Sequence, residues 1–265
     1  MRKYGDFHVH TRFCDGRESI EEMAAAAFKM GMYAIGFSSH SPMPFECGWC
    51  LKENWIEEYK TEIDRVRTTY EDRMEVLAGL ELDLFSELPL EGLDYIICSA
   101  HFVKKDSVYL PVDESGERLQ ADVNAYYNGD IFAYICDFYE EVSHLADRGP
   151  AVIGHYDLVT KFNEGGKLFD ESDPRYLTPA MEALEVLVPK GAVFEINTGA
   201  IFRGYRSRPY PSIPLLRRMQ ELGGRFILSG DCHCYEALCY QFDQAAAYAE
   251  RAGVTKFEKY PPARQ

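Results

Sequence analysis

Residues 6–11 read DFHVHT, a short stretch of apolar and β-branched residues that carries two histidines two positions apart. Such a stretch favours a β-strand, in which alternate side chains point to the same side. His8 and His10 would then face one side together, where both could bind a single metal ion. Comparable apolar runs recur along the chain, so that seven candidate strands result, at residues 6–10, 33–39, 76–82, 95–100, 151–155, 192–197 and 226–230.

Segments with the spacing of amphipathic helices lie between most of these strands. They cover residues 17–30, 52–70, 125–148, 174–189, 213–222 and 237–252. Alternating strands and helices favour an α/β fold with a parallel sheet and right-handed crossovers, either open or closed into a barrel. Residues 83–94, between the third and fourth strands, are too few for a long crossover helix, so we expect a distorted barrel. Because no linker, repeat or low-complexity tract divides the chain, we expect one domain over residues 1–265.

Two long polar stretches, residues 102–130 and 156–173, follow strand ends. The second contains the pair Gly165-Gly166. We expect both to be irregular, and to act as lids or binding loops, because long loops in compact domains usually have such roles.

The composition is that of an ordinary globular protein with an acidic balance, 43 Asp and Glu against 28 Lys and Arg, for a formal net charge of −15. This balance disfavours nucleic acid and a membrane surface as partners, because phosphate groups are bound through clustered Lys and Arg. No apolar run approaches the roughly 18 residues of a spanning helix. The N-terminus has no apolar signal region, so we expect a cytoplasmic protein.

The eight cysteines are expected to be reduced thiols, since disulfide frameworks belong mainly to short secreted chains. Residues 47–50, CGWC, have the spacing of a redox motif. They follow a proline-containing segment, however, instead of opening a helix after a strand. We therefore expect this segment to be a loop.

The histidines are the main functional signal. Six of the seven lie at or just after the ends of predicted strands, and only His144 lies within a predicted helix. Carboxylates lie in the same layer, and in parallel α/β barrels the carboxyl ends of the strands form the active site. The candidate metal ligands are therefore His8, His10, Asp15, His40, Glu81, His101, His155, Asp231 and His233, with Glu195 as a further candidate.

One catalytic ion needs three or four protein ligands and an open position. Nine ligands thus indicate up to three divalent ions, with Glu81 and Asp231 as bridges. Mixed imidazole and carboxylate ligation suits Zn, Mn or Fe(II). A purely structural zinc site is the alternative, but such sites are usually closed and rich in cysteine.

These motifs resemble those of the polymerase-and-histidinol-phosphatase (PHP) family, and within it those of the histidinol-phosphate phosphatases. The resemblance extends from residue 6 to about residue 240 and rests on DFHVHT (6–11), SSHSP (38–42), GLE (79–81), SAH (99–101), GH (154–155), FEIN (194–197) and GDCH (230–233). It implies a distorted (β/α)7 barrel, similar to a TIM barrel, with three metal ions at the strand ends. By the family's pattern, the first ion would be held by His8, His10, Glu81 and Asp231, the second by Glu81, His101 and His155, and the third by Asp15, His40 and His233.

Three divalent ions would leave the site positive and attract a phosphate dianion at short range, although the protein as a whole is acidic. Such ions lower the pKa of bound water, so that a hydroxide can attack phosphorus in line. We expect Asp231 or His233 to transfer the proton to the leaving group. The candidate substrate contacts are Lys161, Asn197, Arg203 and Arg206.

The resemblance implies a metal-dependent phosphatase that hydrolyses L-histidinol phosphate in histidine biosynthesis. Its partner is then a small-molecule phosphate ester, whose imidazole could stack on Phe45, Trp49, Phe102 or Phe162. The alternatives are a PHP phosphoesterase for nucleotides or other small esters, an amidohydrolase, and a non-catalytic interaction module. Seven strands and the Asp231-Cys-His233 pair disfavour an amidohydrolase, and the complete ligand set disfavours an interaction module. The sequence indicates no particular oligomeric state.

Overall fold

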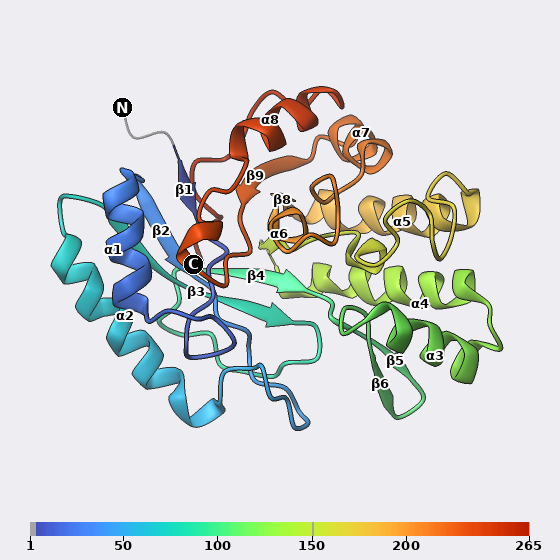
Figure 1. Ribbon diagram of the computed structural model, residues 1–265, viewed down its shortest axis with the longest axis horizontal. Helices are drawn as coiled ribbons and strands as arrows, with labels where there is room; N and C mark the ends of the chain where they lie inside the picture. Colours follow the sequence, from blue (N-terminus) through green and yellow to red (C-terminus); the bar gives the residue numbers. More distant parts are fainter. Residues whose placement is uncertain (1–3, 150, 265) are drawn as a thin grey trace.

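The centre of the molecule is a sheet of seven parallel strands, in a computed structural model that describes residues 4–149 and 151–264 (Figure 1). In spatial order the strands are β1 (Gly5–Asp6), β2 (Ala34–Phe37), β3 (Glu75–Asp83), β4 (Tyr95–Ser99), β7 (Val152–Ile153), β8 (Val193–Asn197) and β9 (Arg225–Ser229). Every neighbouring pair is parallel, and all seven expected strands are present.

The sheet closes into a barrel between the segments that follow its first and last strands. Val9 pairs with Cys232 in a parallel bridge. The amide of Cys232 donates to the carbonyl of His8, and the amide of His10 donates to the carbonyl of Cys232, each at 2.8 Å. The strands differ in length from two residues in β7 to nine in β3, so the expected distorted seven-stranded barrel is confirmed.

Helices lie around the strands (Figure 1): α1 (Ile20–Met30), α2 (Ile56–Tyr70), α3 (Gly116–Tyr127), α4 (Ile131–His144), α5 (Pro174–Leu187), α6 (Gly199–Phe202), α7 (Ile213–Glu221) and α8 (Phe242–Glu250). Their bounds follow from local chemistry, as α1 illustrates. Ser19 and Glu22 form a capping box at its start, and Gly31 ends it with a φ of 75°. Among the described residues, none of the helices is long and apolar enough to cross a bilayer.

The expectation that residues 102–130 are irregular is wrong. They form an antiparallel hairpin, β5 (Phe102–Lys105) and β6 (Val108–Pro111), followed by α3. The single helix expected over 125–148 is also wrong, because Asn128 takes a left-handed φ of 53° that ends α3, and Asp130 caps α4. Residues 156–173 are mostly irregular, as expected, with one short turn of 3-10 helix at Leu158–Thr160.

Residues 47–50 lie in a loop, as expected, but Cys47 and Cys50 form a disulfide. The turn at Gly48 and Trp49 brings the two Cα atoms to 5.5 Å, a separation that a disulfide can span. The expectation of eight reduced cysteines is therefore wrong for this pair. The other six are free thiols.

The amino end of the barrel is filled by apolar side chains, among which Tyr95 is central. Its hydroxyl lies 2.5 Å from the carbonyl oxygen of Phe7 and 3.1 Å from that of Phe37, so it links three strands or strand extensions. A Cβ atom added at Gly79 would lie 2.2 Å from the Tyr95 ring, and one added at Gly36 would lie 2.6 Å from its hydroxyl. The ring can occupy the barrel because both neighbours are glycines.

Replacing Gly79 with alanine should therefore lower the free energy of unfolding by about 1–3 kcal/mol, the usual cost of overpacking a core. Urea unfolding measures this change. Gly48→Ala is the matched control, because a Cβ atom there meets nothing within 4 Å. Equal stability of the two variants would contradict the packing argument.

Candidate metal centre

The carboxyl ends of the strands bring the nine predicted ligands together. Glu81 lies on β3, and the histidines lie just beyond the strands that precede them. Asp15 reaches the same place from the loop after β1. Asp231, after β9, has a φ of 49°. Non-glycine residues rarely adopt this conformation, and those that do are concentrated at functional sites. Four overlapping groups of three or four of these side chains have ligand atoms within 4.8 Å of one another.

Glu81 lies at the centre of the cluster and is 1% exposed. Its Oε2 is 2.8 Å from Nδ1 of His40, 3.2 Å from Nε2 of His8 and 3.5 Å from Nε2 of His10. Its Oε1 is 2.9 Å from Nε2 of His155 and 3.3 Å from Nε2 of His101. One carboxylate thus contacts five imidazoles, which is the arrangement expected of a bridging ligand.

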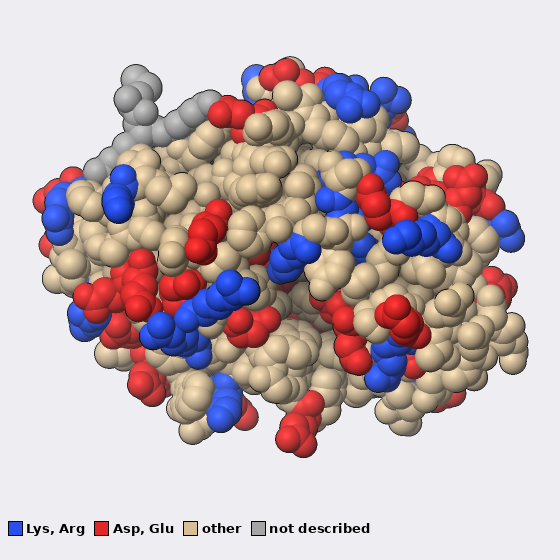
Figure 2. All heavy atoms as spheres, viewed as in Figure 1, with Lys and Arg blue, Asp and Glu red and all other residues tan. Residues whose placement is uncertain are grey.

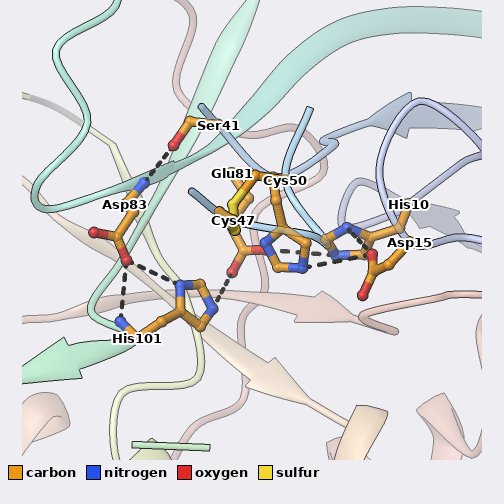
Figure 3. Close-up of a disulfide and its surroundings, with 9 residues drawn as sticks. His10, Asp15, Ser41, Cys47, Cys50, Glu81, Asp83 and His101 are labelled. Carbon is orange, nitrogen blue, oxygen red and sulfur yellow. Dashed lines mark hydrogen bonds and ion pairs between the residues drawn. A yellow bond between two sulfur atoms is a disulfide. The ribbon is translucent and has the colours of Figure 1, made fainter. Parts of the chain in front are cut away.

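Asp15 is the centre of a second, more exposed group of imidazoles beside the group around Glu81. Its carboxylate is 3.2 Å from Nε2 of His233, 3.7 Å from Nε2 of His40 and 3.8 Å from Nδ1 of His10. The rings of His10 and His233 stack with centroids 4.1 Å apart. About a third of the Asp15 side chain is exposed, so this group lies toward solvent. Figure 3 shows His10 and Asp15 to one side of Glu81, opposite His101.

Three buried atoms of the cluster lack hydrogen-bond partners in the described part of the chain: Nε2 of His8, Nε2 of His10 and Oε2 of Glu81. They lie close together but are not aligned as donor and acceptor. A buried polar atom without a partner costs free energy, and a cation between them would satisfy all three. This observation shows that the residues present fit a metal centre.

Electrostatics agree with this reading. Burial, followed by the neighbouring His233 and His40, holds the pKa of His10 well below its usual range. His10 is therefore neutral and has a lone pair to offer a metal ion. Burial acts to raise the pKa of Glu81, but His8, His40 and His101 outweigh it and lower that pKa well below its usual range. Glu81 is accordingly ionised.

A second layer of carboxylates orients the imidazoles. Oε1 of Glu195 is 2.7 Å from Nδ1 of His8, and its Oε2 accepts from the amide of His155 at 3.0 Å and from Nδ2 of Asn197 at 2.9 Å. Oδ2 of Asp83 is 3.1 Å from Nδ1 of His101 (Figure 3). The contacts with Nδ1 of His8 and Nδ1 of His101 turn the other nitrogen of each ring, Nε2, toward the centre. Glu195, considered above as a further ligand, lies in this layer.

Arg203 borders the cluster on its open side. Its Nη2 donates to Oδ2 of Asp231 at 2.6 Å, and its Nη1 is 3.2 Å from Nδ1 of His233. The other oxygen of Asp231, Oδ1, remains 3.4 Å from Nε2 of His10. Asp231 therefore connects a cationic side chain to the centre.

A cavity of about 460 Å³ opens onto this centre. Besides six of the predicted ligands, it is lined by Trp49, Phe102, Pro111, Asp113, Glu114, Leu158, Lys161, Arg203 and Tyr205. Figure 2 shows a hollow near the middle of one face, with basic and acidic side chains both beside it. The wall thus combines aromatic, cationic and anionic groups.

The predicted substrate contacts fall in different places. Lys161 and Arg203 line the cavity, and Nζ of Lys161 is 3.0 Å from the Asp113 carboxylate. Arg206 lies outside the cavity lining, since its buried guanidinium donates to the Thr160 carbonyl and pairs with Glu171 at 3.0 Å. Asn197 is fully buried behind Glu195, with its Oδ1 accepting from the amide of Gly199. The structure therefore does not bring Arg206 and Asn197 to the cavity.

Asp83 and Asp113 lie at the site but were not predicted from the sequence. Asp83 lies two residues after Glu81 on one strand, so the alternation of side chains is a signal that could have identified it. Asp113 follows the β5–β6 hairpin, in the stretch that was expected to be irregular. Of the predicted aromatics, Trp49 and Phe102 line the cavity, Phe45 packs on Phe102, and Phe162 packs on Tyr205.

Comparison with known proteins identifies the family. The PHP domain model matches residues 6–199. The chain is 32% identical over 254 residues to the "Probable histidinol-phosphatase" of Deinococcus radiodurans, covering 91% of this chain and 90% of that protein. It is 27% identical over 271 residues to the histidinol-phosphatase of Bacillus subtilis, covering 93% of this chain and 98% of that protein.

A solved structure shows the same fold. The histidinol phosphate phosphatase of Lactococcus lactis, complexed with zinc, L-histidinol and phosphate, has a TM-score of 0.72 to this chain at 19% identity, over 100% of both chains. Fold and site together define a seven-stranded barrel with a cluster of side chains at its carboxyl end that could hold metal ions. The chain belongs to the PHP domain family.

Replacing Glu195 with glutamine should lower the affinity for metal about 10- to 100-fold. One carboxylate oxygen becomes an NH2 group, which cannot accept a hydrogen bond from Nδ1 of His8 or from the amide of His155, so one of these two residues is no longer held in position. Competition with a chelator of known affinity measures this change. Glu58→Gln, on the exposed face of α2, is the control. Unchanged affinity in the Glu195 variant would show that Glu195 does not orient the ligands.

Proposed function

We propose that this protein is a metal-dependent phosphatase that hydrolyses L-histidinol phosphate to L-histidinol and phosphate, a step of histidine biosynthesis. The observation that carries the proposal is the cluster of Glu81 with eight further candidate ligands, three buried atoms of which have no hydrogen-bond partner among the described residues. The names of the relatives support the substrate, and the Lactococcus lactis structure was solved with zinc and both products of this reaction.

Three divalent ions, of Zn, Mn or Fe, are proposed for this centre. Glu81 would bridge two of them, with His8, His10 and Asp231 on one side and His101 and His155 on the other. Asp15, His40 and His233 would hold the third. When bound, such ions polarise phosphoryl oxygens and provide a nucleophile at neutral pH.

The cationic side chains of the cavity would bind the phosphoryl group. Arg203 is fixed by Asp231 at 2.6 Å and Lys161 by Asp113 at 3.0 Å, so neither has to lose much side-chain freedom when substrate binds. An arginine can donate two parallel hydrogen bonds to a phosphate, which orients it. These two residues are the proposed phosphate contacts.

Asp231 and His233 are proposed to manage the proton of the leaving group. Burial acts to raise the pKa of Asp231, but Arg203 and His8 outweigh it and hold that pKa well below its usual range. Asp231 therefore remains an acceptor. His233 lines the cavity, and its Nδ1 is 3.5 Å from Oδ1 of Asp231. Since its Nε2, beside Asp15, would hold the third ion, the imidazole would pass the proton to the alkoxide from Nδ1, next to Asp231.

Asp113 is the proposed contact for the ammonium group of L-histidinol phosphate. In this ester the ammonium is on the carbon next to the ester CH2 group, so it must lie close to the bound phosphate. The carboxylate of Asp113 is a wall of the cavity, and its electrostatic influence reaches His101 and His155. Lys161, together with these imidazoles, lowers the pKa of Asp113, which opposes the effect of burial and keeps the side chain anionic.

The function is tested by comparing kcat/KM for L-histidinol phosphate with the values for nucleoside monophosphates and simple alkyl phosphates. We expect a preference for L-histidinol phosphate of about tenfold or more, because the wall contacts act on that substrate alone. Removing the metal ions with a chelator should abolish the activity. Equal kcat/KM values for all esters would instead favour the alternative, a PHP phosphoesterase acting on nucleotides or other small esters.

Asp113→Asn should lower kcat/KM for L-histidinol phosphate about tenfold or more, the order of one hydrogen bond to a charged group. The analogue that lacks the amine should lose much less, so the ratio between the two substrates is the measurement. Asp113→Asn can also disturb Lys161, which pairs with Asp113 and is a proposed phosphate contact. Such an effect lowers kcat/KM for both substrates alike and leaves their ratio unchanged, whereas loss of the ammonium contact lowers the ratio.

Glu114→Gln is the matched control for this prediction, because it removes the same charge from the neighbouring residue. Glu114 is 59% exposed and lies 3.7 Å from Arg118. A similar loss of substrate discrimination in both variants would indicate a general field effect and would contradict a specific role for Asp113.

A further inference from the structure

The loop that carries the Cys47–Cys50 disulfide is tied to the metal centre at both ends. The amide of Ser41 donates to the carbonyl of Glu81 at 2.8 Å, and the amide of Leu51 donates to the carbonyl of His40 at 3.0 Å. Between these points, in the part of the chain that the structure describes, residues 42–50 form no helix or strand and only the turn at Gly48 and Trp49. The conformation of this loop therefore depends on side-chain packing and on the disulfide.

Trp49 lies between the two bonded cysteines and reaches the predicted ligands. Its ring centroid is 4.5 Å from that of His40 and 5.5 Å from that of His101, in edge contacts. It is also nearly parallel to Phe102, at 8° and 6.1 Å. Figure 3 shows the disulfide in the same close-up as Glu81 and His101. The indole thus forms a wall of the cavity directly beside the centre.

We propose that the Cys47–Cys50 disulfide is a redox-controlled clamp that holds Trp49 in place to stack on the imidazole of the substrate. When the disulfide is intact, Trp49 and Phe102 present a fixed aromatic wall. When it is reduced, the loop relaxes and the enzyme loses affinity for the ester that carries a ring. This inference rests on the proposed function, since it assigns the ring of L-histidinol phosphate to this wall.

The chemistry is thiol–disulfide exchange with a dithiol reductant. Cys47 is partly exposed and Cys50 is buried, so a thiolate of the reductant attacks Sγ of Cys47 and Cys50 leaves as a thiolate. The second thiolate of the reductant then attacks the reductant's first sulfur, which is bonded to Sγ of Cys47 in the mixed disulfide. Cys47 leaves as a thiolate. Two electrons and two protons pass from the dithiol to the protein, and the reductant becomes a cyclic disulfide.

Reduction should act locally. The disulfide closes a ring between residues only three apart, so its contribution to global stability through the unfolded chain is small. The strands and the predicted ligands lie outside the ring. We therefore expect a change in substrate selectivity with little change in melting temperature.

The test compares the wild-type protein before and after dithiothreitol, with the reductant removed and the metal content measured. The selectivity, as kcat/KM for L-histidinol phosphate over ethyl phosphate, should fall about fivefold on reduction, the order of one aromatic contact. Most of this change should come from KM for L-histidinol phosphate. Thiol titration of the unfolded protein confirms that two further thiols have formed.

Fluorescence provides a readout that does not depend on activity. The chain has two tryptophans, so in a Trp55→Phe variant the emission reports Trp49 alone. Reduction should shift this emission to longer wavelength as water reaches the indole. The same shift should be absent when the Cys47→Ser/Cys50→Ser variant, in the same background, is treated with dithiothreitol.

The double variant also controls for metal binding by the reductant. It should have the selectivity of the reduced wild type and should not respond to dithiothreitol. Cys136→Ser, which changes an exposed free thiol on α4, should respond as the wild type does.

Two outcomes separate the inference from the proposed function. If the wild type prefers L-histidinol phosphate equally in both redox states while the titration shows full reduction, the clamp is refuted and the function stands. If neither redox state prefers L-histidinol phosphate over ethyl phosphate, the proposed function itself fails.

Discussion

A carboxylate buried among five imidazoles is the constraint on which the rest of this structure depends. Glu81 is almost fully inaccessible, and its oxygens lie 2.8–3.5 Å from the nearest imidazole nitrogens. Removing such a charge from water costs several kcal/mol unless cations compensate it. His8 and His101, whose pKa values are raised well above the usual range by carboxylates that include Glu81, supply part of that positive charge, whereas neutral His10 supplies none and leaves it to a metal ion. The barrel must therefore deliver ligands from nearly all of its strands to one point.

The two ends of the barrel divide this work. The amino end is apolar and closely packed around Tyr95, whose ring is accommodated by Gly79 and Gly36. The carboxyl end carries the ligands and a second layer, with Glu195 and Asp83 each bonded to an imidazole. A closely packed base fixes the strands, and the second layer fixes the rings, so the atoms that could bind an ion are held in place by the protein itself.

The strands, and the clustering of the candidate ligands at their carboxyl ends, could be predicted from the sequence because both depend on local pattern. Short apolar runs that end in histidine indicate where strands end. The carboxyl ends of parallel strands lie together, so these positions also indicate which side chains form the layer of candidate ligands. The direction of a loop side chain depends instead on partners far away in the sequence. Arg206 turns away from the cavity because Glu171, 35 residues earlier, pairs with it. The β5–β6 hairpin is stabilised by contacts such as that of Lys105 with Asp137 on α4, which its polar sequence does not reveal. The Cys47–Cys50 disulfide depends on a local turn that brings the two cysteines together. The expectation of reduced thiols rested instead on the kind of chain that usually contains disulfides, which is short and secreted.

The proposed chemistry and the proposed selectivity therefore belong to different parts of the chain. Most of the candidate ligands lie on or just beyond the strands, while Trp49 and Asp113, the proposed contacts for the rest of the substrate, come from the loop after β2 and from the segment after the β5–β6 hairpin. Loops can change without disturbing the barrel, so one centre can serve esters that share only a phosphoryl group. In this chain the separation is incomplete, because Trp49 contacts His40 and His101 directly. The indole that is proposed to recognise the far end of the substrate is thereby packed against two of the side chains that are proposed to hold the ions.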